Sequence, residues 1–350
     1  MVPLTISAQN GIINQYDYFD KQIASLNLSN YYILRNGDFA YNKSYSNGYP
    51  YGTVKRLDKF EEGALSSLYI CFKVINVDSN YLTFYFDSNK WNREVKLISG
   101  EGARNHGLLN LSPVDFFNMK LFISSNNKEQ IKIAYFLKLL NRKIKLLSLK
   151  IQALKKYKEG LIQQTLKSTI KVPLKKIINE SLNKTVTNNQ YVLLSSTAKG
   201  IFLQSDFFNH QVASKNNIGY KILEEGQIVF SPQNLWLGNI NLLTKYKIGC
   251  VSPSYKIFDI NTKIVDSNYL IEIMRTKLFL HKYKLCSEQG ASVVRRNLDL
   301  DQFLNIRVPI PSNDKFYSLL KEINYLIEKE SSKLNIIISI KNYLLKNMFI

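Results

Sequence analysis

The sequence predicts an α+β (mixed α/β) protein with two duplicated globular domains, separated by two long helices that form an antiparallel coiled coil with pseudo-two-fold symmetry. Three observations predict this class. One phrase occurs twice, as GIINQYDYFDKQIAS at 11–25 and GIFLQSDFFNHQVAS at 200–214, with eight of fifteen positions identical. Short strand-like runs alternate with Gly, Asn and Pro in both halves. A long stretch with apolar residues at heptad spacing follows each half.

The repeated phrase belongs to a duplication that runs through the whole chain. Framework residues agree at a spacing of 189, namely Gly11 with Gly200, Phe19 with Phe208, and Gly37 with Gly226. Further on, DSNYL recurs, and LNLSPVDFFNMKLFISSN (109–126) faces NLDLDQFLNIRVPIPSN (297–313). Spacings drift only between 186 and 189, as expected when insertions lie in loops. The phrase therefore predicts a shared scaffold, with Phe19 and Phe208 in the core.

The duplication divides the chain into four parts. These are a first globular domain (1–125), a central helix (126–168), a second globular domain (169–312) and a final helix (313–350). Strands are expected at these runs: YYILR (31–35), SSLY (66–69), KLFIS (120–124), YKILE (220–224), SPSY (252–255) and RVPIPS (307–312).

The second domain starts with a segment that has no counterpart in the first. This segment is KVPLKKIINESLNKTVTNNQ (171–190), and the spacing of 189 aligns Met1 with Gln190. The first domain is therefore expected to be truncated at its N-terminus.

Both long helices carry an apolar seam at alternating spacings of three and four. Its residues are Leu137, Leu140, Ile144, Leu147, Ile151, Leu154 and Leu161 in the central helix, and Ile323, Ile327, Leu334, Ile337 and Leu344 in the final one. A seam of this kind must be buried against a partner, and the other helix is the obvious one. Lys158 interrupts the first seam and Glu330 the second. Opposite charges at these interruptions predict a register that brings the two residues together.

The formal charge of +20 and the isoelectric point near 9.6 favour a polyanionic partner, above all nucleic acid. The alternative is a lysine-rich composition whose lysines are merely solvated. Three scattered cysteines, no signal peptide and no run of eighteen apolar residues predict a cytoplasmic protein with no membrane partner.

No recognisable catalytic chemistry is present in the sequence. There is no Gly-rich phosphate loop, the three histidines lie far apart, and Asp and Glu are dispersed without a nuclease-like cluster. The sequence therefore predicts no catalytic residue, no metal site and no cofactor bound by this chain. A lone nuclease or methyltransferase is disfavoured, and so is an adhesion-type coiled-coil protein, because the charge is high and no export signal is found.

The chain resembles the specificity (S) subunit of type I restriction-modification systems over essentially its whole length. The motifs that carry the resemblance are PLTISAQNGIINQ, GDFAYNKSYSNGYPYGTVKR, EQIKIAYFLKLLNRKIKLLSLKIQALKKYKEGLIQQ and the ending LLKNMFI. The resemblance implies two target-recognition domains that each read half of a split target on double-stranded DNA. It also implies helices that set the distance between the half-sites and dock two modification subunits.

The resemblance places catalysis in the partners of this chain. Modification (methyltransferase) subunits would bind S-adenosylmethionine, and restriction/translocase subunits would use ATP and Mg²⁺. The alternative is a stand-alone architectural or regulatory DNA-binding coiled-coil protein.

Half-site specificity must differ between the copies, and the copies diverge most just after the shared Gly37/Gly226 strand. Candidate DNA-binding residues there are Asn42, Lys43, Tyr45, Tyr49, Tyr51, Lys55 and Arg56 in the first copy, and Gln233, Asn234 and Trp236 in the second. Asn and Gln can pair with adenine, and Lys or Arg with guanine or phosphate. The aromatic residues could equally pack each loop against its own domain. Secondary candidates are Gln9, Asn10, Lys199, Arg104, Arg295 and Arg296.

Overall fold

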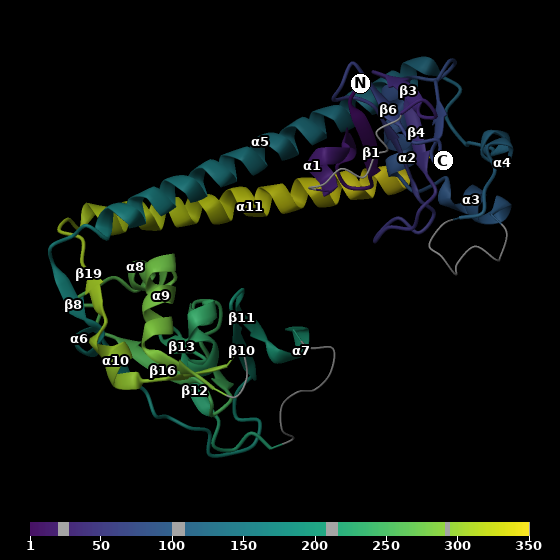
Figure 1. Ribbon diagram of the computed structural model, residues 1–350. Helices are drawn as coiled ribbons and strands as arrows, with labels where there is room; N and C mark the ends of the chain where they lie inside the picture. Colours follow the sequence, from purple (N-terminus) through teal and green to yellow (C-terminus); the bar gives the residue numbers. More distant parts are fainter. Residues whose placement is uncertain (20–27, 100–108, 208–215, 291–294, 350) are drawn as a thin grey trace. The chain divides into compact units, whose positions relative to one another are not determined.

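The computed structural model describes residues 1–19, 28–99, 109–207, 216–290 and 295–349 (Figure 1). The chain forms two compact units: unit 1 combines Met1–Lys150 with Glu330–Ile350, and unit 2 is Ile151–Lys329. Each unit combines small β-sheets with short helices and parts of both long helices. The predicted α+β class is confirmed. Among the described residues, no helix combines the length and apolar character needed to span a bilayer.

Unit 1 contains two sheets, of strand order β2-β1-β6-β3 and β5-β4-β7. Its elements are β1 (Pro3–Ser7), β2 (Gly11–Asn14), α1 (Gln15–Phe19), β3 (Tyr32–Arg35), β4 (Phe39–Asn42), β5 (Thr53–Arg56), β6 (Glu62–Leu65), β7 (Ile70–Phe72), α2 (Ser79–Asp87), α3 (Asn92–Ile98), α4 (Pro113–Asn118) and the first part of α5 (Asn127–Thr165). The larger of its two cores is aromatic: Tyr41 stacks on Phe116 at 4.8 Å between ring centroids, and the Trp91 indole donates to the Phe86 carbonyl at 2.9 Å.

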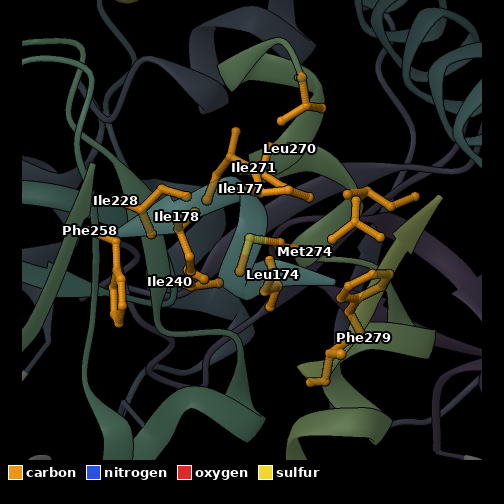
Figure 2. Close-up of a cluster of buried hydrophobic side chains, with 14 of the residues drawn as sticks. Leu174, Ile177, Ile178, Ile228, Ile240, Phe258, Leu270, Ile271, Met274 and Phe279 are labelled. Atoms are coloured by element: carbon orange, nitrogen blue, oxygen red, sulfur yellow. The ribbon is translucent and has the colours of Figure 1, made fainter. Parts of the chain in front are cut away.

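Unit 2 repeats this plan with one additional strand on its central sheet, whose order is β14-β13-β16-β9. Its elements are β8 (Lys171–Pro173), α6 (Leu174–Ile177), β9 (Ile178–Glu180), β10 (Leu194–Thr197), β11 (Gly200–Leu203), α7 (Gln204–Phe207), β12 (Lys221–Glu224), β13 (Ile228–Phe230), the 3-10 helix η2 (Pro232–Leu237), β14 (Ile240–Leu242), β15 (Ile248–Val251), β16 (Lys256–Ile260), α8 (Ser267–Met274), α9 (Lys277–Leu285), β17 (Ser287–Gln289), β18 (Arg296–Leu298), α10 (Leu300–Asn305), β19 (Arg307–Pro309) and the first part of α11 (Lys315–Asn347). Its main core brings Leu174 and Ile177 of α6 together with Met274 and Phe279 (Figure 2).

The two units match residue by residue in their central sheets. Phe39 lies opposite Phe72 across β4 and β7, and Ile228 lies opposite Phe258 across β13 and β16. The turn after each preceding strand is also the same: Gly37 and Gly226 have φ of 91° and 88°. A φ of this sign favours glycine, which explains why both copies keep it.

The long helices α5 and α11 are antiparallel where they pack within each unit. In unit 1, Leu137 shares a core with Leu345, and in unit 2, Ile162 shares one with Leu320. All twelve predicted seam residues are buried or half-buried. The predicted pairing of Lys158 with Glu330 is wrong: Lys158 bonds Glu272 at 2.8 Å, and Glu330 bonds Lys150 at 2.9 Å. The seam pattern is the same at each heptad, so it does not by itself fix the register.

The carboxylate of Glu330 makes stability depend on pH. Its residue is only 5% exposed, and hydrogen bonds from Lys150 and Lys333 lower its pKa. A carboxyl group whose pKa is lowered by folding stabilises the fold at pH values above its unfolded pKa of about 4.3. That contribution is lost as the pH falls through the pKa of the folded state.

We expect Glu330→Gln to lower the melting temperature at pH 7 and to reduce the fall in melting temperature between pH 6 and pH 3. Thermal unfolding followed by circular dichroism measures both effects, with exposed Glu322→Gln as the matched control. Identical pH profiles for the two variants would contradict this role.

Three further expectations are wrong. Phe19 is 38% exposed at the end of α1, because the repeated phrase leaves the sheet after β2; Phe208 lies outside the described residues. SSLY and SPSY form turns that precede β7 and β16. KLFIS (120–124) is not a strand, because no other described strand pairs with it, whereas its counterpart β19 pairs with β8.

Candidate nucleic-acid interface

Equivalent hairpin tips in the two units carry three of the predicted residues. Gln9 and Asn10 lie exposed at the β1–β2 turn, and Lys199 lies exposed at the β10–β11 turn. Each turn is held by a side chain of the strand before it: Ser7 Oγ accepts from the Asn10 amide at 3.1 Å, and Thr197 Oγ1 from the Lys199 amide at 3.1 Å. The tips therefore present polar and basic side chains on a fixed backbone.

The loop from 43 to 52 joins β4 to β5 in unit 1. Tyr45 is 62% exposed, whereas Tyr51 packs against the aromatic core. Asn42 accepts from the Ser44 amide at 2.9 Å, and the Lys43 ammonium donates to the Leu111 carbonyl at 3.2 Å. A tight turn at 46–49 closes the loop. Of these side chains, Tyr45 is the one most exposed to an approaching duplex.

Lys55 and Arg56 are paired inside unit 1. The Lys55 ammonium lies 2.7 Å from Asp87 and 5.5 Å from the centre of the Tyr49 ring. Arg56 pairs with Asp58 at 2.7 Å and also donates to Ser79 and Asn80 of α2. A DNA contact by either cation would have to compete with these bonds.

The second predicted loop is the 3-10 helix η2. Gln233 is exposed, and Asn234 is half-buried with its amide bonded to the Ser231 carbonyl at 3.1 Å. Trp236 packs against the unit's core, and the Lys284 ammonium lies 5.9 Å from the centre of its ring. The packing interpretation thus holds for Trp236, while Gln233 faces solvent.

The β17–β18 hairpin lies beside η2 and α9. Arg296 donates from Nε to Ser287 Oγ at 2.8 Å and from a terminal nitrogen to the Lys284 carbonyl at 3.2 Å. Arg295 is exposed. The structure thus groups Arg295, Arg296 and Lys284 near Trp236, whereas Arg104 lies outside the described residues.

Each unit has a polar pocket beside the long helices that the sequence did not predict. In unit 1 it has a volume of about 360 Å³ and is lined by Arg56, Asn80 and Asp87 with Lys138 of α5. In unit 2 it has a volume of about 470 Å³. Its polar and charged lining includes Lys158, Lys199, Asn241, Lys245, Asn268, Glu272 and Arg275.

The two pockets are equivalent in the repeat but differ in chemistry. Asn241 stands where unit 1 has Lys55, and Arg275 stands where it has Asp87. Arg275 donates to Asn241 and, at 2.9 Å, to the Ile240 carbonyl, and burial lowers the pKa of its guanidinium. No motif marks these residues, because their partners lie more than thirty positions away in sequence. They are divergent residues at positions that the two copies of the repeat share.

Possible metal ligands and cysteines are scattered in the part of the chain that the structure describes. No group of three His, Cys, Asp or Glu side chains there could hold a metal ion. The three cysteines are unpaired, and burial raises the pKa of each thiol.

Comparison with solved structures identifies the architecture. A chain from a structure of the assembly and conformational transition of a type I restriction-modification system superposes with a TM-score of 0.52 and 12% identity, over 98% of this chain and 90% of that one. The S subunit from M. genitalium gives the same score and identity, over 90% and 83%. The chain has the fold of a type I specificity (HsdS) subunit. The HsdS subunit of Thermoanaerobacter tengcongensis is more distant, with a TM-score of 0.43. No family model and no curated protein matches the sequence.

Proposed function

We propose that this HsdS-like chain is the DNA sequence-recognition subunit of a type I restriction-modification complex. The observation that carries the proposal is the likeness in fold to a chain of a type I restriction-modification system over 98% of this chain, and to a type I S subunit over 90% of it. The net charge of +20 is consistent with a polyanionic partner. Each unit reads one half of a bipartite target on double-stranded DNA, and the helices α5 and α11 dock two modification subunits and, with them, the restriction subunits.

The chain itself performs no catalysis in this proposal. S-adenosylmethionine belongs to the modification subunits, and ATP with Mg²⁺ to the restriction subunits. Exposed side chains, namely Gln9 and Lys199 at equivalent hairpin tips and Arg295 beside β18, contact phosphates and fix the position of each unit. Base reading falls to the divergent loops, with Tyr45 in unit 1 and Gln233 with Asn234 in unit 2, since Gln and Asn pair bidentately with adenine.

Salt dependence of DNA binding tests the proposal directly. Phosphate contacts release counterions, so removing one is expected to reduce the slope of log affinity against log salt by about 0.9. We expect Lys199→Ala and Arg295→Ala each to flatten the slope, measured by fluorescence anisotropy on duplex DNA from low to moderate salt. Lys321→Ala on α11 is the charge-matched control.

Co-purification from the native host, followed by mass spectrometry, distinguishes the recognition subunit from a stand-alone DNA-binding protein. Recovery of a methyltransferase with the tagged chain is expected. Salt-independent DNA binding, or robust DNA methylation or cleavage by the purified chain alone, would overturn the proposal.

A further inference from the structure

The polar pocket of unit 2 carries an excess of positive charge. Its charged lining consists of Lys158, Lys199, Lys245, Glu272, Arg275 and Glu328. Lys158 and Glu272 neutralise one another, because the ammonium lies 2.8 Å from the carboxylate. Three cations therefore remain, and the remaining carboxylate of the lining is that of Glu328 on α11.

The three remaining cations come from different elements that meet around β14. At the C-terminal end of α8, the Arg275 guanidinium donates to Asn241 of β14. Asn241 donates in turn to the Thr197 carbonyl at 2.8 Å, in the hairpin whose tip carries Lys199. Lys245 lies in the loop that follows β14. Among the described residues, none of the three cations forms an ion pair with a carboxylate.

The equivalent pocket of unit 1 has no such excess. Its charged lining consists of two cations and two carboxylates, namely Arg56, Lys138, Asp58 and Asp87. Arg56 pairs with Asp58 at 2.7 Å, and Lys55 pairs with Asp87 at 2.7 Å. The repeat places Thr244 where unit 1 has Asp58, and Arg275 where it has Asp87. A hydroxyl and a guanidinium thus replace the two carboxylates.

Lys245 also differs from its counterpart in unit 1. The Leu57 and Leu243 carbonyls accept from equivalent glycine amides, so Lys59 occupies the position of Lys245. The Lys59 ammonium donates to the Asn10 carbonyl at 3.1 Å. Lys245 is exposed, and its ammonium has no hydrogen-bond partner in the part of the chain that the structure describes. It is therefore available to a ligand.

We propose that the pocket of unit 2 binds a phosphate group, carried by a small molecule or by the DNA backbone. A phosphate offers several oxygens to separate donors, so Arg275 and the two lysines can bind it together. The volume of about 470 Å³ is sufficient for a nucleoside phosphate. The neutral pocket of unit 1 binds none. Only the DNA source rests on the function proposed above.

Isothermal titration of the full chain with inorganic pyrophosphate, at constant ionic strength, tests the small-molecule source. Saturable binding is expected, and Lys245→Ala should weaken it about tenfold because one charge-assisted hydrogen bond is lost. Lys247→Ala is the matched control, since Lys247 is exposed nearby but does not line the pocket.

Two further variants should change the affinity in opposite directions. Thr244→Asp restores the carboxylate of unit 1 and should weaken pyrophosphate binding by about tenfold or more. Glu328→Gln removes the carboxylate that opposes the ligand and should strengthen binding severalfold. Because a misfolded variant would not bind more tightly, the second result keeps charge separate from stability.

Duplex DNA tests the other source. If a backbone phosphate occupies the pocket, Lys245→Ala should reduce the slope of log affinity against log salt by about 0.9, measured by fluorescence anisotropy, whereas Lys247→Ala should not. Pyrophosphate binding with an unchanged DNA slope assigns the pocket to a small molecule, even if the chain does not recognise DNA. The proposal is overturned if Lys245→Ala changes neither measurement, or if Lys247→Ala has an equal effect on both.

Discussion

Replacement of Gly52 by alanine is expected to cost unit 1 about 3 kcal/mol or more of stability, with a fall in melting temperature of roughly 6–12 °C. Gly52 ends the loop before β5 with φ of 77°, a conformation that strains any residue with a Cβ. An added Cβ would also overlap the Asn42 backbone oxygen and lie 2.9 Å from the Tyr41 ring. Backbone cannot yield as a flexible side chain can, so the β4–β5 hairpin would have to shift.

Gly48 in the same loop provides the matched control. Its φ of 82° is as unfavourable for alanine, but nothing lies within 4 Å of an added Cβ. Gly48→Ala should therefore cost only about 1 kcal/mol, the strain alone. Thermal unfolding separates the two variants, and DNA binding should suffer more in Gly52→Ala because the loop carries Tyr45. Equal melting temperatures would mean that the crowding around Gly52 does not constrain the loop.

The sequence predicts the fold well because the chain contains the same plan twice. Gly37 and Gly226 match in sequence and have nearly the same φ, and their amides donate to equivalent carbonyls, those of Leu57 and Leu243, at 2.9 and 2.8 Å. A turn with a positive φ favours glycine at one fixed position of the sequence. Two such glycines, one in each copy of the repeat, therefore indicate that the two copies share the same backbone fold.

Other features depend on neighbouring elements of the fold that a sequence pattern does not identify. KLFIS has the composition of a strand, but a strand requires a neighbour, and none of the other described strands of unit 1 pairs with it. Phe19 is repeated like a core residue yet is 38% exposed, because repetition reports a shared role and not burial.

Only part of the candidate interface could be predicted from the sequence, for the same reason. Exposed positions such as Gln9, Lys199 and Gln233 could be chosen from residue type and divergence. The bonds that α2 makes with Lys55 and Arg56 join residues more than twenty positions apart in sequence and could not be predicted. Divergence identifies where two copies differ, but it does not reveal which cations are already paired.

The largest effect in unit 2 is expected at Asn241, which is 3% exposed. Its amide nitrogen donates to Ser196 Oγ at 2.7 Å and to the Thr197 carbonyl at 2.8 Å, and its oxygen accepts from Arg275. Asn241→Ala removes all three bonds and deprives the buried Ser196 hydroxyl of one of its partners, at a cost of about 3 kcal/mol. The β10–β11 hairpin that presents Lys199 would lose its support, so DNA affinity should fall as well.

A double-mutant cycle distinguishes this coupling from a simple loss of packing. Arg275→Met removes the charge and keeps much of the volume, so Asn241→Ala should cost less in its presence, with an interaction energy of about 1–3 kcal/mol. The equivalent pair in unit 1, Lys55 with Asp87 at 2.7 Å, is an ion pair whose side chains are 15% and 27% exposed, and it should couple by about 1 kcal/mol or less. Urea unfolding of the four variants in each cycle measures both energies. Additive losses at Asn241 and Arg275 would show that the bond between them does not hold the hairpin in place.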